Sequence, residues 1–229
     1  MNKIKNILKD HYDIDIFNVS QQQGGWAARA YKLSNNKNTY FLKVYKKSRA
    51  SSPKLTALID EYVPIVIWLM NNSDLKGKIP VPFLTNNGEY KCEDDDGIYL
   101  LYEYIDGVTI GDQVLTEDQV FQLSEIISKL HLYGEEIPID TNAVKEDFYV
   151  PFLQQLRNTL DKDYEDIPND VRKIVAPHIE QINHLIDTVE KLSLCLKNSH
   201  LRMALFHTDL HNWNLMQSEQ RLILIDWEG

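Results

Sequence analysis

Hydrophobic and polar positions along residues 1–45 predict one helix followed by a small sheet. Ile4, Ile7 and Leu8 recur at helical spacing within residues 1–11, which is typical of a short amphipathic helix. Three strand-like runs follow, at 15–20, 28–33 and 40–45. The polar segment 34–38 predicts a turn between the last two runs. We therefore expect an antiparallel sheet.

The pattern between residues 53 and 105 predicts a helix and then further hairpins. Residues 53–72 look helical, although Pro64 lacks a backbone donor and should bend the helix or start its second segment. Asn86–Gly88 and Asp94–Gly97 are turn signals around strands that end in residues 98–105. The acidic run 93–96 is better explained as a solvated turn than as a metal site, because a glycine closes it.

Helical periodicity replaces the strand pattern near residues 106–112. We expect helices over residues 116–133, 144–160 and 170–196. The whole pattern predicts an α+β chain with two lobes. Residues 1–105 would form a sheet lobe that ends in a hinge at about 101–107, and residues 106–229 would form a mainly helical lobe.

Composition is that of a globular protein without a membrane segment. The chain has 229 residues and 43% apolar content, enough to bury a sizeable core. Its longest apolar stretch, Val63–Met70, is far shorter than the roughly 20 residues that span a bilayer, and its first residues lack a signal-peptide core. Cys92 and Cys195 are too few for a disulfide framework or a zinc motif. We expect a cytoplasmic protein.

The formal charge of −10 narrows the range of partners. Binding to nucleic acid requires clustered basic side chains, so an acidic chain of this kind is not expected to bind it. An acidic surface instead favours a cationic small molecule, although net charge does not locate a cleft.

The segment from His207 to Asn214, followed by a strand-like run and Asp226, carries the strongest chemical signal. Asp209 has the place of a carboxylate that accepts the proton of an attacking hydroxyl, and Asn214, five positions later, has the place of a magnesium ligand. Asp226 follows the apolar run 222–225, where a second metal ligand is needed. A polar loop before a buried strand is the alternative. The order of the three oxygen donors favours a phosphoryl-transfer site with Mg²⁺.

On these residues the chain resembles the aminoglycoside phosphotransferase and choline kinase-like family, including the spectinomycin phosphotransferase type. The resemblance implies the bilobal protein-kinase-like fold, ATP or GTP as co-substrate and transfer of the γ-phosphoryl group to a small molecule. Ser/Thr protein kinases of this fold usually carry lysine two positions after the catalytic aspartate. His211 stands there in this chain, which points away from a protein substrate.

The resemblance also assigns nucleotide-binding residues in the first half of the chain. Gly24 and Gly25 would form a loop near the phosphates, although a simple hairpin turn has the same sequence. Lys43, alternating among apolar residues, would bind the nucleotide phosphates, with an edge or snorkelling lysine as the alternative. Glu61 would be its partner, although Asp60 is adjacent and Glu61 could simply face solvent.

The segment 100–107 resembles the hinge of the family. The carbonyl of Glu103 and the N–H of Ile105 would bind the adenine edge, with Tyr102 behind the base. An ordinary buried strand that leads into a turn would have the same pattern.

Three histidines have different expected roles, two of them in the motif and one, His131, at the end of a predicted helix. His207 should support the loop through backbone contacts or packing, since a carboxylate is the better base at neutral pH. His211 could approach phosphate or substrate. His131 is expected to be a packing residue.

Kinases of this family usually continue for several helices beyond the motif at which this sequence ends, so we expect the C-terminal part of the helical lobe to be missing. The function that the sequence predicts is a kinase for an aminoglycoside or aminocyclitol. The alternatives are a metabolite kinase for choline, a fructosamine or an amino alcohol, and a truncated nucleotide-binding protein without turnover. The sequence does not predict an oligomeric state.

Overall fold

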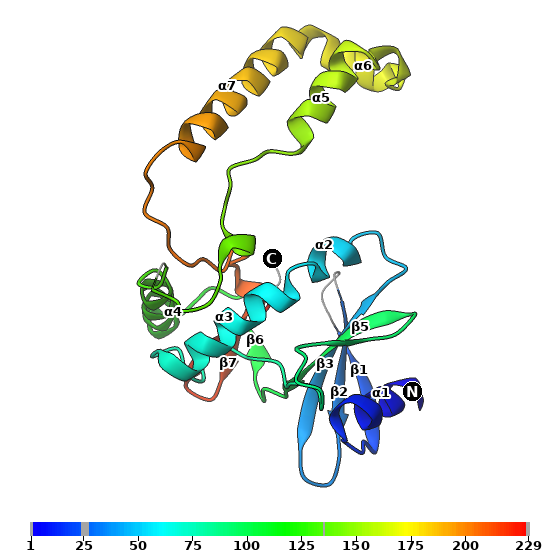
Figure 1. Ribbon diagram of the computed structural model, residues 1–229, viewed down its shortest axis with the longest axis vertical. Helices are drawn as coiled ribbons and strands as arrows, with labels where there is room; N and C mark the ends of the chain where they lie inside the picture. The colour runs from blue at the N-terminus through cyan, green and yellow to red at the C-terminus, as the bar shows by residue number, and fades with distance from the viewer. Residues whose placement is uncertain (1, 24–27, 135, 228–229) are drawn as a thin grey trace. The chain divides into compact units, whose positions relative to one another are not determined.

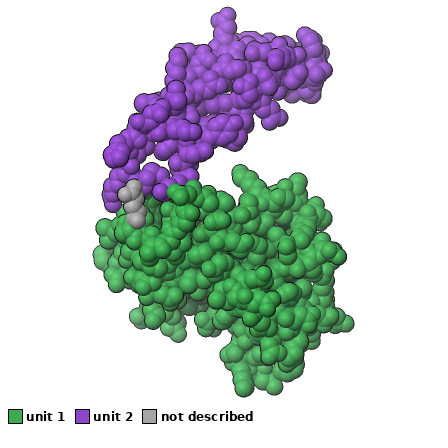
Figure 2. All heavy atoms as spheres, in the orientation of Figure 1, with its two compact units in different colours: residues 1–144, 204–229 green, residues 145–203 purple. Residues whose placement is uncertain are grey.

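The structure is a computed structural model that describes residues 2–23, 28–134 and 136–227. The chain divides into two compact units, one made of residues 1–144 and 204–229 and the other of residues 145–203 (Figure 2). Sheets and helices are both present, so the predicted α+β class is confirmed. The predicted lobe boundary at 105/106 falls inside the first unit, and the bounds of the two lobes stay a prediction.

The first unit begins with a helix and a five-stranded antiparallel sheet, as predicted (Figure 1). Helix α1 spans Asn2–Tyr12. The sheet has the order β1-β2-β3-β5-β4, with strands at Asn18–Gln22, Arg29–Ser34, Thr39–Lys46, Gly97–Glu103 and Cys92–Glu93. Apolar residues of α1 and of one sheet face form a common core.

Strand β3 presents different side chains to the two faces of the sheet. Leu42 and Val44 pack in the core with α1, whereas Tyr45 packs in a second core with Ile59 and Val63 of a later helix. Side chains alternate between faces with a period of two. Lys43 therefore shares the face of Tyr45, away from α1.

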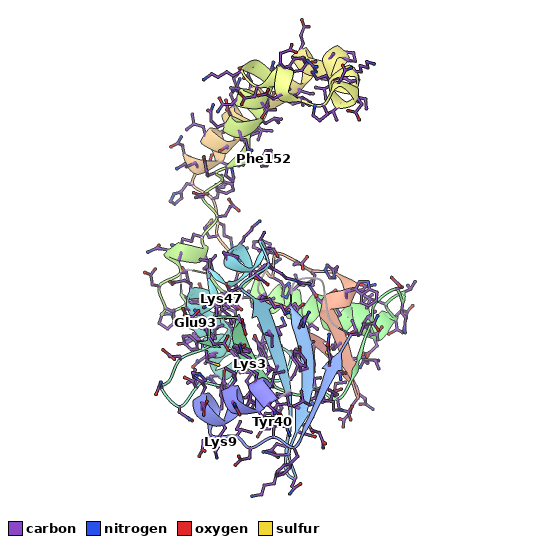
Figure 3. The ribbon with its side chains drawn as sticks, turned by 90° about the vertical axis from the view of Figure 1, so that its right-hand side faces the viewer. Lys3, Lys9, Tyr40, Lys47, Glu93 and Phe152 are labelled. Carbon is purple, nitrogen blue, oxygen red and sulfur yellow. The ribbon has the colours of Figure 1, made fainter. Side chains whose placement is uncertain are left out.

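Ion pairs hold the β4–β5 hairpin against its neighbours. Lys3 of α1 lies 2.8 Å from Asp94. Lys47 lies 3.0 Å from Glu93, and both of these side chains are labelled in Figure 3. Burial alone would raise the pKa of Asp94, but hydrogen bonds from Lys3, backbone N–H groups and the Tyr99 hydroxyl lower this pKa to about 2. The acidic run is thus a turn, as predicted.

The predicted helix over residues 53–72 is two helices, α2 (Ser52–Thr56) and α3 (Ile59–Asn72). The expectation that Pro64 bends the helix or starts its second segment was wrong about the start, because α3 already begins at Ile59 and runs through Pro64. The proline lies in the second turn of α3 and has no N–H. Only the carbonyl of Asp60, near the helix start, therefore lacks its helical hydrogen-bond donor.

A three-stranded antiparallel sheet lies beyond the hinge in the same unit. Its strands are β6 (Val108–Thr109), β7 (Leu215–Ser218) and β8 (Arg221–Leu224), in that order. The strand at β8 was predicted within one residue, whereas β6 and β7 were not predicted.

Helix α4 (Glu117–Leu130) packs on this sheet. A capping box between Thr116 and Gln119 satisfies the first backbone donors of the helix. Gln122 then accepts a hydrogen bond from the Leu222 N–H of β8 at 2.8 Å. The side chain of Gln122 therefore satisfies a backbone donor of the strand that leads to Asp226.

Gly107 joins the hinge to β7 at a distance that leaves no room for a side chain. A methyl group added there would lie 2.5 Å from the carbonyl oxygen of Gln217. We expect Gly107→Ala to lower the free energy of unfolding by about 1–3 kcal/mol, because backbone atoms must move apart. Urea denaturation measures this change. Gly88→Ala is the control, since its added methyl group meets open space and only its positive φ of 79° opposes the change. Equal losses in the two variants would contradict the close-approach argument.

The second unit consists of helices α5 (Phe152–Asp161), α6 (Asn169–Val175) and α7 (Ile179–Lys197). The predicted helix over 144–160 starts later than expected, next to Pro151, and the predicted helix over 170–196 is interrupted by a 3₁₀ turn that contains Pro177. Proline lacks the N–H that a helix interior needs, which accounts for both corrections. Among the described residues, no helix is long and apolar enough to cross a membrane.

Candidate active site

A tight turn over residues 207–209 carries the predicted base. The N–H of Asp209 donates to the carbonyl of His207 at 2.9 Å, which closes a γ-turn around Thr208. Thr208 has a positive φ of 65°, an unusual conformation for a β-branched residue. Its hydroxyl donates to the same His207 carbonyl at 2.6 Å. Backbone strain of this kind is typical of functional sites, and here the turn leaves Asp209 exposed.

Asn214 is buried and holds the Asp209 carboxylate. Its Nδ2 donates to the backbone carbonyl of Asp209 at 2.8 Å and to Oδ2 of the Asp209 side chain at 3.0 Å. Both N–H groups of the amide are therefore used, and its carbonyl oxygen is the atom left to act as a ligand. His211 joins the same group, with Nε2 at 3.4 Å from Asp209 Oδ2.

The loop is fixed to the strand that precedes Asp226. The N–H of Ile225 donates to the carbonyl of Asn214 at 2.9 Å, and Nε2 of the buried His207 lies 2.8 Å from the carbonyl oxygen of Ile225. The His207 ring also packs edge-on against Trp227, with centroids 4.7 Å apart. These contacts fix the His207 ring against the strand, and its supporting role stays a prediction.

Lys43 and Asp226 form an ion pair across the first unit. The Lys43 side chain is largely buried, whereas 43% of the Asp226 side chain is exposed. Asp226 has a positive φ of 66°, a conformation that aspartate tolerates better than most residues. The structure thus places the predicted phosphate-binding lysine against a predicted metal ligand.

The predicted partner of Lys43 lies elsewhere. Glu61 is exposed in the first turn of α3, and its carboxylate forms no ion pair with any residue that the structure describes. A carboxylate in water keeps its hydration, whereas Asp226 contacts Lys43 directly. A pair between Lys43 and Glu61 therefore stays a prediction. Gly24 and Gly25, the predicted phosphate loop, lie outside the described residues.

The hinge backbone presents polar groups on one edge. The Tyr104 N–H donates to Thr39 of β3 at 3.2 Å, so the neighbouring N–H and carbonyl of Glu103 point away from β3. Within the described residues, no backbone group bonds to the carbonyl of Glu103 or to the N–H of Ile105. The Glu103 carbonyl and the Ile105 N–H can therefore pair with a donor and an acceptor of a nucleotide base. The buried Tyr102 packs in the core with α3.

The donor set suits Mg²⁺ bound together with phosphates. Asn214 and Asp226 offer one amide oxygen and one carboxylate, the hard oxygen ligands that Mg²⁺ prefers. Within residues 2–23, 28–134 and 136–227, no three His, Cys, Asp or Glu side chains gather into an all-protein metal cage. Mg²⁺ is commonly held by one or two protein ligands with substrate phosphates and water completing the shell, and these two residues match that number.

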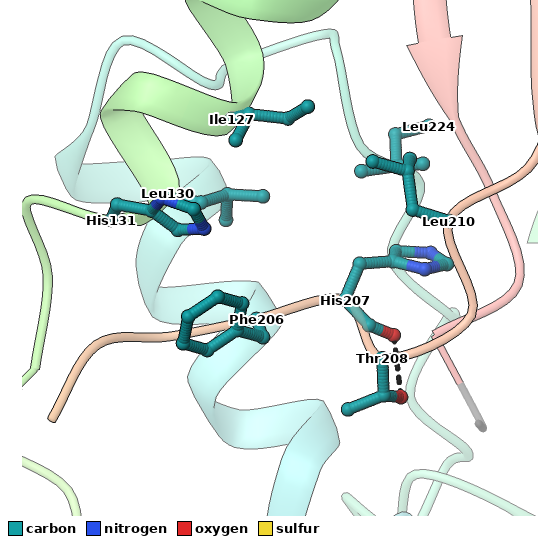
Figure 4. A pocket seen from close by; sticks show the side chains of 8 residues that line it. All are labelled: Ile127, Leu130, His131, Phe206, His207, Thr208, Leu210 and Leu224. Carbon is teal, nitrogen blue, oxygen red and sulfur yellow. Dashed lines mark hydrogen bonds between the residues drawn. The ribbon is translucent and has the colours of Figure 1, made fainter.

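A small cavity of about 170 Å³ lies behind the loop, between α4 and residues 206–210 (Figure 4). Its lining is mainly apolar, and the His131 ring packs there against Phe206 with centroids 4.5 Å apart. This contact agrees with the packing role predicted for His131. Asp209 does not line the cavity, which distinguishes it from the candidate active site.

Two features of the site were missed from the sequence. The Lys43–Asp226 pair joins positions 183 residues apart, and local patterns carry no signal for it. The sequence also gives no signal for the strained backbone at Thr208, because threonine does not favour a positive φ.

Comparison with known proteins identifies relatives of this arrangement. Residues 18–229 match the profile of the phosphotransferase enzyme family. No curated protein is similar enough in sequence to count as a relative.

Several solved structures share the fold. Spectinomycin phosphotransferase APH(9)-Ia, in complex with ADP and spectinomycin, is similar with a TM-score of 0.70 and 24% identity, over 99% of this chain and 68% of that one. A thermostable mutant of aminoglycoside phosphotransferase APH(4)-Ia, with AMP-PNP and hygromycin B, has a TM-score of 0.60 and 15% identity over 100% and 71% of the two chains. A proposed fructosamine-3-kinase from Haemophilus somnus 129PT has a TM-score of 0.56 and 15% identity, over 97% and 70%.

Proposed function

The chain belongs to the phosphotransferase enzyme family, and from this premise we propose that it transfers the γ-phosphoryl group of ATP or GTP to a hydroxyl of a small cationic molecule. The observation that carries the proposal is the hydrogen-bonded group of Asp209 and Asn214, fixed through Ile225 to the strand that ends at Asp226. An aminoglycoside or aminocyclitol antibiotic is the proposed acceptor.

Each residue of the site has a role that its surroundings support. Asp209 is exposed, so a substrate hydroxyl can reach it and transfer its proton to the carboxylate. The amide oxygen of Asn214 and the carboxylate of Asp226 would hold Mg²⁺, which when bound neutralises charge on the phosphates. Lys43, already beside Asp226, would bind the nucleotide phosphates next to the metal.

The hinge would bind the base of the nucleotide. The carbonyl of Glu103 can accept from an exocyclic amino group, and the N–H of Ile105 can donate to a ring nitrogen. Adenine offers this pattern, and guanine offers a different order of donors and acceptors on its corresponding edge. ADP, AMP or AMP-PNP is present in the structures of APH(9)-Ia and APH(4)-Ia that share the fold.

Three observations support a small cationic acceptor. The similar structures APH(9)-Ia and APH(4)-Ia contain spectinomycin and hygromycin B. His211 stands where Ser/Thr protein kinases carry lysine. The formal charge of −10 favours the approach of a cation at low salt. ATP as co-substrate and free thiols at Cys92 and Cys195 suit a cytoplasmic location.

A metabolite kinase is the second candidate. The fold is shared with a proposed fructosamine-3-kinase, and such an enzyme would use the same base and metal ligands on a different alcohol. The two candidates differ in the acceptor alone.

Phosphate transfer to a panel of acceptors tests the proposal. The 229-residue chain is incubated with Mg²⁺, ATP or GTP, and spectinomycin, hygromycin B, choline, a fructosamine or a generic protein substrate. We expect phosphorylation of a small cationic alcohol and none of the proteins. Rising ionic strength should lower kcat/KM, because salt screens exposed charges over about 8 Å at physiological concentration.

The outcomes of the panel separate the candidates. Transfer to choline or the fructosamine alone would favour a metabolite kinase. Phosphorylation of the protein substrates alone would defeat the proposed acceptor class. Nucleotide binding without transfer to any acceptor would favour a nucleotide-binding protein without turnover.

A further inference from the structure

The two carboxylate oxygens of Asp209 have different surroundings. Oδ2 accepts a hydrogen bond from Asn214 Nδ2 at 3.0 Å and lies 3.4 Å from His211 Nε2. Oδ1 accepts no hydrogen bond from any residue that the structure describes. Oδ2 is therefore held by the loop, and Oδ1 is open to the hydroxyl group of a substrate.

Hydrogen-bond capacity indicates which atom of the His211 ring carries a proton. Asn214 Nδ2 lies 3.5 Å from His211 Nε2, but its two N–H groups already donate to Asp209 at 2.8 and 3.0 Å. The nearest acceptor for Nε2 is then Oδ2 of Asp209. A protonated Nε2 beside a carboxylate is favourable, whereas an unprotonated one would place two acceptors against each other.

The backbone holds the imidazole in this place. The His211 carbonyl accepts the Asn214 N–H at 2.9 Å, and His211 directly precedes the 3₁₀ turn Asn212–Asn214. The separation of 3.4 Å is longer than a strong hydrogen bond, so a small movement of the ring closes it. Polar contacts at active sites often tighten in this way when substrate binds.

We propose that His211 is a positioning residue that, with Asn214, holds Oδ2 of Asp209 and so leaves Oδ1 to accept the proton of the acceptor hydroxyl. This inference rests on the proposed function. In the reaction the hydroxyl oxygen bonds to the γ-phosphorus, and the bond from that phosphorus to its bridging oxygen breaks. The nucleoside diphosphate leaves with the electron pair, and the hydroxyl proton passes to Oδ1. His211 acts through Asp209 and contacts neither phosphorus nor acceptor.

Two substitutions of His211 separate positioning from packing. His211→Phe keeps a planar ring without a donor, and His211→Gln supplies an N–H three bonds from Cβ, as Nε2 of histidine is. With Mg·ATP and spectinomycin, we expect His211→Phe to lower kcat about tenfold or more while KM for Mg·ATP changes less than about twofold, since a misplaced catalytic group can cost up to about 10²-fold. His211→Gln should recover most of the loss. His184→Gln, on the exposed part of α7, is the matched control and should keep kcat.

The kinetic results can overturn the inference in three ways. A normal kcat in His211→Phe, a change confined to KM, or a His211→Gln variant as slow as His211→Phe would each contradict a positioning role.

Nitrogen NMR of the histidine rings tests the contact without turnover. We expect the His211 ring to carry a proton on Nε2, and its ring nitrogen shifts to change in Asp209→Ala. An unprotonated Nε2, or shifts that do not respond to Asp209→Ala, would overturn the inference. If the enzyme transfers phosphate to no acceptor, the proposed function fails, and the NMR result alone decides the contact between His211 and Asp209.

Discussion

Replacement of Asp209 by asparagine should lower kcat by at least about 10²-fold while nucleotide binding persists. General base catalysis typically contributes about 10²–10⁴-fold, and an amide cannot accept the proton. Asparagine keeps the shape of the side chain, and Asp209 lies in an exposed turn, so the fold should survive. Steady-state kinetics with the acceptor found in the panel, together with calorimetric titration of nucleotide, measures both effects.

Asp10→Asn is the matched control for this experiment. It makes the same chemical change on an exposed position of α1 and should leave kcat unchanged. Near-normal turnover in Asp209→Asn would show that another group accepts the proton.

Replacement of Asp226 by alanine should remove the Mg²⁺-dependent part of nucleotide affinity. Loss of a residue that only supports a metal ligand typically costs about 10–100-fold in metal affinity, and loss of a direct ligand should cost no less. Calorimetric titration with ATP, with and without Mg²⁺, measures the difference. Asp226→Ala also leaves Lys43 without the carboxylate it contacts.

Asp226→Asn distinguishes the loss of a metal ligand from an effect on the backbone conformation. Asp226 has a positive φ of 66°, which asparagine accepts more readily than alanine does. The asparagine variant keeps one oxygen ligand and should retain part of the Mg²⁺ dependence. If both variants bind nucleotide with the same dependence on Mg²⁺ as the parent, Asp226 is not a metal ligand.

The parts of the fold that were predicted from the sequence are those with a local pattern. The strands around Lys43 are short apolar runs separated by polar turns, and their pairing as an antiparallel sheet was confirmed. By contrast, β6 has only two residues, and it is a strand because β7, more than a hundred residues later, pairs with it. Local propensity carries no information on such a partner.

The candidate site shows the same division. The spacing from Asp209 to Asn214 is set within one loop, and the structure brings these two residues together. The Lys43–Asp226 contact depends on how two distant segments pack, and local spacing does not predict it. The partner assigned to Lys43 from the sequence, Glu61, came from the family resemblance and stays a prediction. Strain at Thr208 follows from the closure of the γ-turn, which residue type alone does not predict.

The contact between the hinge and β7 makes the connection between them rigid. Gly107 lies against the Gln217 carbonyl, Ser218 donates to the Asp106 carbonyl at 2.7 Å, and β6 pairs with β7 directly afterwards. The Ser218 hydroxyl thus ties the hinge to β7, and backbone hydrogen bonds run from β6 through β7 to β8 and, at the Ile225 N–H, to the residue before Asp226.

If the base of a nucleotide binds at the hinge, the main-chain geometry of this small sheet sets the distance from the base to Asp226. One residue inserted between Tyr104 and Val108 would shift the pairing of β6 by a step and turn its side chains to the opposite face. The distance from the hinge to Asp226 would then no longer match the length of the nucleotide, even with every proposed catalytic side chain unchanged. If the proposed site is correct, the length of this segment matters as much as the residues proposed to perform the chemistry.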